Sequence, residues 1–105
     1  MMKDDVRLRA VVLKGFFPKL IGIKSKKLKN KSVILYNCCD VHSFGLSRNL
    51  DLAFVDRYGK TMKVVREFKP WSRCKCKGAK YVIERYSQRS RPWFKEGERL
   101  IMPKY

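Results

Sequence analysis

Acidic residues are scarce in this sequence: its 105 residues include nine Asp and Glu against 26 Lys and Arg, which leaves a formal net charge of +17 at pH 7. The chain also has no run of about 18 apolar residues, the length that a membrane-spanning helix needs. Its first residues lack the charged-then-apolar pattern of a signal peptide. We therefore expect a soluble, cytoplasmic protein of one domain with no membrane span.

Several signatures of catalysis are missing as well. The sequence has no glycine-rich phosphate loop, no Gly-x-Ser-x-Gly nucleophile elbow and no pair of carboxylates spaced for acid–base work. These absences favour a binding or accessory protein over an enzyme, and we expect no cofactor.

Short apolar segments predict a mainly β fold. Fully apolar or nearly apolar runs at 33–36 and 50–55 are typical of buried strands, and the alternation at 7–14 predicts a strand with one wet face. Asp56 and Gly59 have the spacing of a type I turn in a hairpin. Further strands are expected at 61–66, 81–84 and 99–102.

Helical signals are few. The spacing of apolar residues predicts a short helix at 16–23, and Pro92 and Gly97 could bound one helical turn at 90–96. We expect one domain over residues 7–102, with tails at 1–6 and 103–105. Its expected architecture is a small curved sheet or barrel of five to seven short strands with one or two short helices.

Two dense basic segments are candidate anion-binding sites. They are residues 24–31 and 73–80, with the charges on Lys24, Lys26, Lys27, Lys29, Lys31, Arg73, Lys75, Lys77 and Lys80. Alternate charges lie on one side of an extended segment, and a field of this size favours polyanions. The sequence therefore predicts an anionic ligand, an acidic partner or a nucleic acid. A solvated surface without a ligand is the alternative interpretation.

The single histidine lies near several thiols. Cys38 or Cys39, His42 and Asp51 are the minimal set for a thiol-dependent enzyme. Zinc is a second hypothesis, with ligands from Cys38, His42, Cys74 and Cys76, although Cys74 and Cys76 are closer in sequence than paired zinc ligands usually are. Disulfides are a third hypothesis, but the reduced thiols of a cytoplasmic protein are favoured.

The order of these residues resembles a known family. The segment Cys38…Val41-His42-Ser43-Phe44-Gly45-Leu46, followed by Asp51, Asp56 and Gly59, is similar to the pattern of the bacterial and archaeal family called domain of unknown function 192. Leu46 and Ser43 stand where that pattern has Met and Thr. The resemblance implies a compact, mostly β, barrel-like domain with short helices, and it implies no known activity.

The central motif also has a structural interpretation. A polar cluster of His42 and Asp51 could pin a loop by hydrogen bonds, and Trp71 and Trp93 are expected to be core or lid aromatics. The candidate cluster for a pocket or for architecture is Cys38, His42, Phe44, Asp51 and Asp56. The leading prediction is a non-enzymatic binding module for an anionic ligand or acidic partner. Nucleic-acid binding and a thiol- or metal-dependent enzyme are the alternatives.

Overall fold

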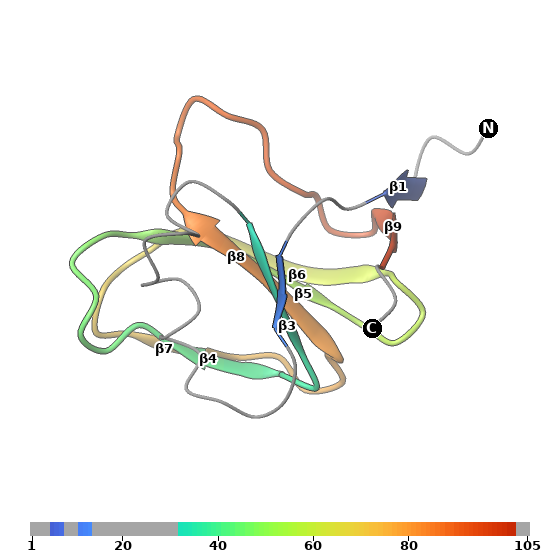
Figure 1. Ribbon diagram of the computed structural model, residues 1–105, viewed down its shortest axis with the longest axis horizontal. Helices are drawn as coiled ribbons and strands as arrows, with labels where there is room; N and C mark the ends of the chain where they lie inside the picture. The colour runs from blue at the N-terminus through green and yellow to red at the C-terminus, as the bar shows by residue number, and fades with distance from the viewer. Residues whose placement is uncertain (1–4, 8–10, 14–31, 103–105) are drawn as a thin grey trace.

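The computed structural model describes residues 5–7, 11–13 and 32–102, and these residues form strands, turns and loops without a helix (Figure 1). Nine strands are present, of which seven lie in the continuous stretch 32–102. Their bounds are β1 Asp5–Arg7, β2 Val11–Leu13, β3 Val33–Tyr36, β4 Asp40–His42, β5 Leu50–Val55, β6 Thr61–Phe68, β7 Arg73–Lys75, β8 Tyr81–Tyr86 and β9 Arg99–Ile101.

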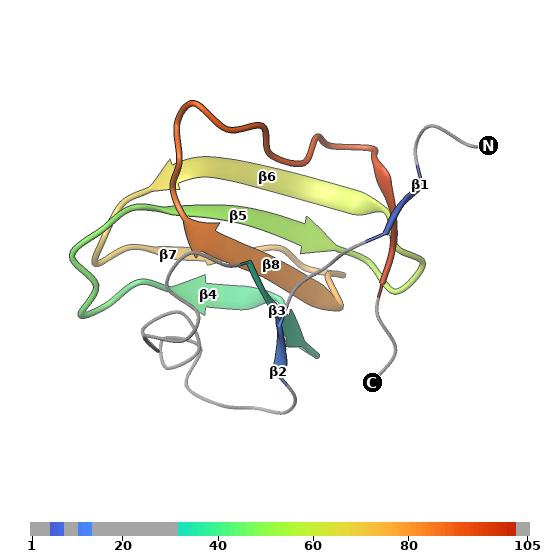
Figure 2. The ribbon, with the colours of Figure 1, turned by 45° about the horizontal axis from the view of Figure 1, so that its top comes forward.

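A five-stranded sheet with the order β2-β3-β8-β5-β6 is the centre of the fold (Figure 2). Strand β2 is parallel to β3, and the other pairings in this sheet are antiparallel. Two small two-stranded sheets accompany it: β1 pairs with β9, and β4 pairs with β7. Among the described residues β2 and β6 are the edge strands of this sheet, so it does not close into a barrel, one of the two expected forms.

Apolar side chains fill both faces of this sheet. Strands β3 and β5 are buried along their whole length, as continuous apolar runs should be when both faces of a sheet are covered. One face carries Leu52 and Phe54, against which Val41 of β4 packs. The other face carries Ala53 and Val55, and residues 93–102 cover it. The sheet is therefore the middle layer of three.

The turn between β5 and β6 has the expected geometry. Gly59 has a φ of +89°, its amide donates to the carbonyl of Asp56 at 3.1 Å, and Asp56 Oδ1 accepts from the amides of Tyr58 and Lys60. A Cβ on Gly59 would lie 2.3 Å from the carbonyl oxygen of Leu100. Glycine is required there both for its backbone conformation and for the close approach of β9.

Most of the predicted strands are confirmed, and the prediction of a second helix needs correction. The helical turn expected at 90–96 is an irregular loop, because Trp93 and Phe94 both turn inward to pack on the second face. No strand was expected at β7, and β1 spans the expected boundary between the tail 1–6 and the domain. The predicted helix at 16–23 lies outside the described residues. Nowhere in the described ranges is there a helix of the length and apolarity needed to cross a membrane.

Candidate functional site

Strands β4 and β7 form an antiparallel ribbon with two different faces. In the register, Asp40 lies opposite Lys75, Val41 opposite Cys74 and His42 opposite Arg73. Val41 is buried and Cys74 packs against the same core cluster, so the alternate residues point outward. The outer face of the ribbon therefore carries Asp40, His42, Arg73 and Lys75.

An aromatic stack extends this outer face beyond the ends of the strands. The rings of His42 and Phe44 are stacked with their centroids 4.7 Å apart. Phe44 in turn stacks on Trp71 at 5.9 Å, with an interplanar angle of 21°. Phe44 is 44% exposed and Trp71 is 69% exposed. Two large aromatic side chains thus lie side by side in solvent.

A buried serine holds the loop that carries Trp71. The hydroxyl of Ser43 donates to the carbonyl of Lys69 at 2.6 Å and accepts from the amide of Ser72 at 3.0 Å. The amide of Trp71 donates to the carbonyl of Ser43 at 3.0 Å. Trp71 has a φ of +59°, a conformation that costs a non-glycine residue about 1–3 kcal/mol. The loop therefore keeps Trp71 in solvent at an energetic cost.

Cationic side chains lie on the ribbon and on the segments that flank β7. Arg73 makes a two-pronged ion pair with Asp40, with distances of 2.6 and 3.1 Å. Lys69, Lys75 and Lys77 are exposed, and none of them forms an ion pair within the described residues. The alternation expected for Arg73, Lys75 and Lys77 thus places the first two on the same outer face as the aromatic rings.

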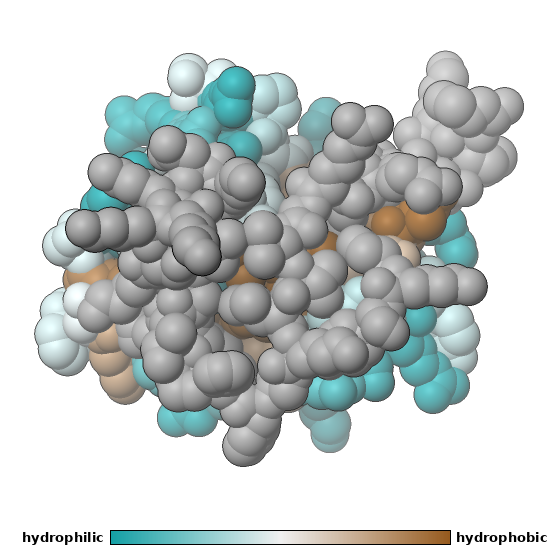
Figure 3. All heavy atoms as spheres, viewed as in Figure 1, coloured by the Kyte–Doolittle hydropathy of each residue, from teal (hydrophilic) through white to brown (hydrophobic). Residues whose placement is uncertain are grey.

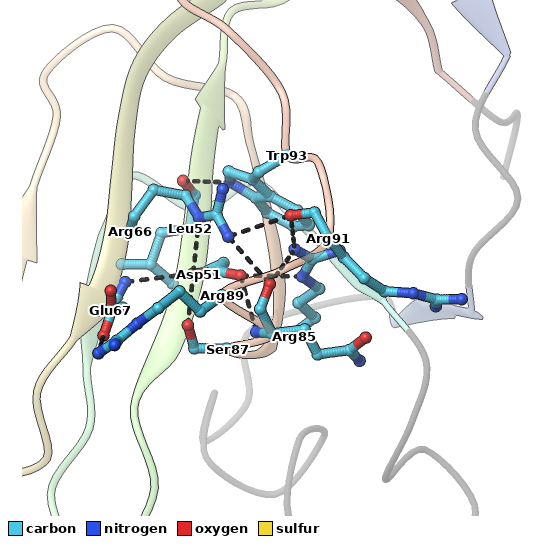
Figure 4. A network of polar contacts seen from close by, with 10 residues as sticks. Asp51, Leu52, Arg66, Glu67, Arg85, Ser87, Arg89, Arg91 and Trp93 are labelled. Atoms are coloured by element: carbon cyan, nitrogen blue, oxygen red, sulfur yellow. Dashed lines mark hydrogen bonds and ion pairs between the residues drawn. The ribbon is translucent and has the colours of Figure 1, made fainter.

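Asp51 belongs to a different site, on the opposite face of the central sheet (Figure 4). Its Oδ1 accepts from Arg66 Nε at 3.1 Å and from the Ser87 hydroxyl at 2.9 Å, and its Oδ2 accepts from Arg85 Nε at 2.9 Å. The amide of Glu67 donates to Oδ1 at 3.1 Å. Burial alone would raise the pKa of Asp51, but the bonds from Glu67, Arg85, Ser87 and Arg66 outweigh it and lower that pKa.

The arginines also fasten the loop after β8. Arg66 and Arg85 both donate to the carbonyl of Arg91, at 3.2 Å each. The guanidinium of Arg85 stacks 4.5 Å above the ring of Trp93, and Trp93 Nε1 donates to the carbonyl of Leu52 at 2.9 Å. Trp93 therefore covers the core as expected, whereas the same expectation for Trp71 is wrong.

The expected hydrogen bond between His42 and Asp51 is not formed. Asp51 lies on the sheet face of Ala53 and Val55, while β4, the strand of His42, packs over the other face. His42 Nδ1 is buried and has no hydrogen-bond partner in the described part of the chain. Of the predicted cluster, the structure keeps His42 and Phe44 together, buries Cys38 in the core and places Asp56 in the β5–β6 turn.

The cysteines form neither the hypothetical zinc site nor a disulfide. All four are free thiols, so no disulfide joins Cys38 or Cys39 to the later pair. The arrangement of Cys38, His42, Cys74 and Cys76 offers no metal site, and no other group of three or more His, Cys, Asp or Glu does so in the described ranges. Burial raises the pKa of the Cys76 thiol, which favours its protonated form over the nucleophilic thiolate.

Two residues that build this surface, the buried Ser43 and the exposed Trp71, were not singled out as site residues from the sequence. Ser43 was noted only because it stands where the family pattern has Thr. Trp71 was expected to be a core or lid aromatic. The one available signal was that Trp71 follows Pro70 and precedes a segment of alternating charges. The lysines of the first basic segment, 24–31, lie outside the described residues.

No protein-family description, curated protein or solved structure matches this sequence. The resemblance to domain of unknown function 192 therefore stays a prediction.

Proposed function

We propose that the protein is a non-enzymatic binding module for single-stranded nucleic acid, and that the outer face of the β4–β7 ribbon is its binding surface. The observation that carries the proposal is Trp71, held in solvent by a strained backbone beside Phe44. A side chain exposed to 69% adds little to the core. Backbone strain that no packing explains is typical of a functional position.

The chemistry of the surface suits bases and phosphates together. Proteins that bind single strands combine a cationic groove for the backbone with aromatic side chains on which bases stack, and each stacked base contributes about 1–3 kcal/mol. Here Phe44 and Trp71 supply the aromatic faces, and Lys69, Lys75 and Lys77 supply the charge. The carboxylates of an acidic protein would meet the same lysines, but they would not stack on Phe44 and Trp71 as a nucleobase does.

Fluorescence anisotropy with a labelled ten-nucleotide uridine strand, r(U)10, tests the proposal. We expect saturable binding at low salt, and a loss of tenfold or more in affinity for Trp71→Ala and for Phe44→Ala. Tyr58→Ala is the matched control: Tyr58 is 65% exposed, but it lies in the turn between β5 and β6, at the other end of that hairpin from residues 69–72 (Figure 1). The affinity of the Tyr58→Ala variant for r(U)10 should equal that of the wild type.

The salt dependence provides a second measure. The slope of log affinity against log salt changes by about 0.7 for each phosphate contact to a single strand. Lys75→Gln should lower the slope by that amount, whereas Lys60→Gln, a change in the β5–β6 turn, should leave it unchanged. Absence of binding at 50 mM salt, or equal affinities for the wild type and Trp71→Ala, would overturn the proposal.

A further inference from the structure

A polar pocket lies at the same end of the sheet as the aromatic stack. Its volume is about 390 Å³, and it is lined by Ser47, Arg48, Asn49, Glu67, Ser87 and Arg89. These residues precede β5, end β6 and follow β8, and the register places Leu50 opposite both Phe68 and Tyr86. The volume is at the lower end of the range for small-ligand pockets, about 300–1,000 Å³.

The buried Asp51 holds two of the residues that line this pocket, Glu67 and Ser87. Its Oδ1 accepts from both the Glu67 amide and the Ser87 hydroxyl, at 3.1 and 2.9 Å. Glu67 is held at a φ of +54°, in the same costly region as Trp71. The loop after β8, over which Figure 3 shows hydrophilic side chains, contributes Ser87 and Arg89. The internal network of Asp51 thus positions residues that face solvent.

The pocket offers a cation and a carboxylate to one ligand. The guanidinium of Arg48 lies 4.3 Å above the ring of Tyr86, and it has no ion pair in the described part of the chain. Glu67 is bound by Arg89 at 2.9 Å, in a pair whose side chains are 38% and 84% exposed. Because a carboxylate repels phosphate, the group that meets Glu67 must be a hydrogen-bond donor, while the phosphate meets Arg48.

From this arrangement we infer that the pocket takes one ribonucleotide of the bound strand, with its phosphate on Arg48 and a ribose hydroxyl donating to Glu67. The inference rests on the proposed function and names its substrate class as RNA. The 2′-hydroxyl is a donor that every ribonucleotide carries whatever its base, and DNA lacks it. Phe44 and Ser47 are three residues apart, so their backbones are at most about 11 Å apart. One strand can therefore reach both the stack and the pocket.

The experiment compares r(U)10 with d(U)10, two strands that differ only in the 2′-hydroxyl. We expect the wild type to bind r(U)10 about tenfold more tightly, the size of effect of one hydrogen bond to a charged acceptor. Glu67→Gly removes the carboxylate and suits the positive φ, so this variant should fold and bind both strands equally. Glu67→Gln keeps an acceptor and should retain part of the preference. Arg48→Gln should lower the affinity for both r(U)10 and d(U)10. Arg57→Gln, a change in the β5–β6 turn, should lower neither affinity.

Three outcomes separate this inference from the function on which it rests. If neither strand binds, the proposed function fails and the inference fails with it. If both strands bind equally to the wild type, or if Glu67→Gly keeps the full preference, the inference alone is overturned. A competition experiment with uridine monophosphate distinguishes a nucleotide within an RNA strand from a free nucleotide. If uridine monophosphate competes with an affinity equal to that of r(U)10, the pocket binds a free nucleotide, and the inference that it binds a nucleotide of an RNA strand is overturned.

Discussion

The amide of Trp71 donates to the backbone carbonyl of Ser43 at 3.0 Å, although 28 residues separate the two in the sequence. The bond joins the loop after β6 to the residue that follows β4. It holds Trp71 at a positive φ and in solvent. Since a buried indole would add to the stability of the fold and this one does not, the arrangement favours binding over stability.

Replacing Trp71 by Gly should raise stability and weaken nucleic-acid binding. Glycine adopts the positive φ without strain, so the variant should gain about 1 kcal/mol in the free energy of unfolding and some 4–8 °C in Tm. Loss of the stacked ring should cost about 1–3 kcal/mol of nucleic-acid affinity. Thermal denaturation and anisotropy measure the two effects. A fall in Tm would show that Trp71 is structural after all.

Replacing Ser43 by Ala should weaken both stability and binding. The hydroxyl is fully buried and connects the carbonyl of Lys69 with the amide of Ser72, and its removal leaves polar groups unsatisfied at a cost of about 1–3 kcal/mol. The loosened loop should then hold Trp71 less firmly. Urea denaturation checks the stability, with Ser90→Ala, a change in an exposed turn, as the matched control. Equal midpoints for the two variants would contradict the role of Ser43.

Replacing Gly59 by Ala should be far more harmful than replacing Gly97 by Ala. Both glycines have a φ near +90°, so both substitutions bear the cost of the left-handed region, about 1–2 kcal/mol. Only at Gly59 does the new methyl group meet a backbone atom, the Leu100 carbonyl oxygen at 2.3 Å, while nothing lies within 4 Å at Gly97. We expect Gly59→Ala to cost at least about 2 kcal/mol more. Urea midpoints that agree within error would refute the close approach of β9.

Replacing Asp51 by Asn should destabilise the fold in a pH-dependent way. Two guanidinium groups lose their carboxylate, one of them largely buried, and breaking such a pair costs about 3 kcal/mol. The folded protein lowers the pKa of Asp51, so its contribution is complete above the unfolded value, about 3.9, and falls as the pH drops through the lower folded value. The urea midpoints of wild type and variant should therefore differ by a constant amount well above about pH 4 and begin to approach each other as the pH falls below it.

Asp40→Asn is the matched control for that experiment. Asp40 also pairs with an arginine, but Arg73 and Asp40 are 66% and 30% exposed. Exposed pairs contribute at most about 1 kcal/mol, so this variant should lose little stability at neutral pH. A difference between wild type and Asp51→Asn that does not change with pH would show that the carboxylate charge is not what stabilises the network.

The strands were the most predictable part of the fold. Apolar runs such as Val33–Tyr36 and Leu50–Val55 are buried on both faces. A run of consecutive apolar residues indicates such burial without any knowledge of distant contacts. The turn at Asp56 and Gly59 was predictable for the same reason, since its hydrogen bonds join residues at most four apart. The ribbon of β4 and β7 was missed because its strands have three residues each, too few to show a period.

Charge, strand content and the hairpin turn follow from the sequence by itself, because each depends on composition or on neighbours along the chain. The partners of Asp51 and the exposure of Trp71 were decided only by the tertiary structure. The hydrogen bonds to Asp51 come from residues 15–37 positions away, and the loop of Trp71 is held by a serine 28 positions earlier. A hydrogen bond depends on distance in space, and only the packing of the strands brings such distant residues together.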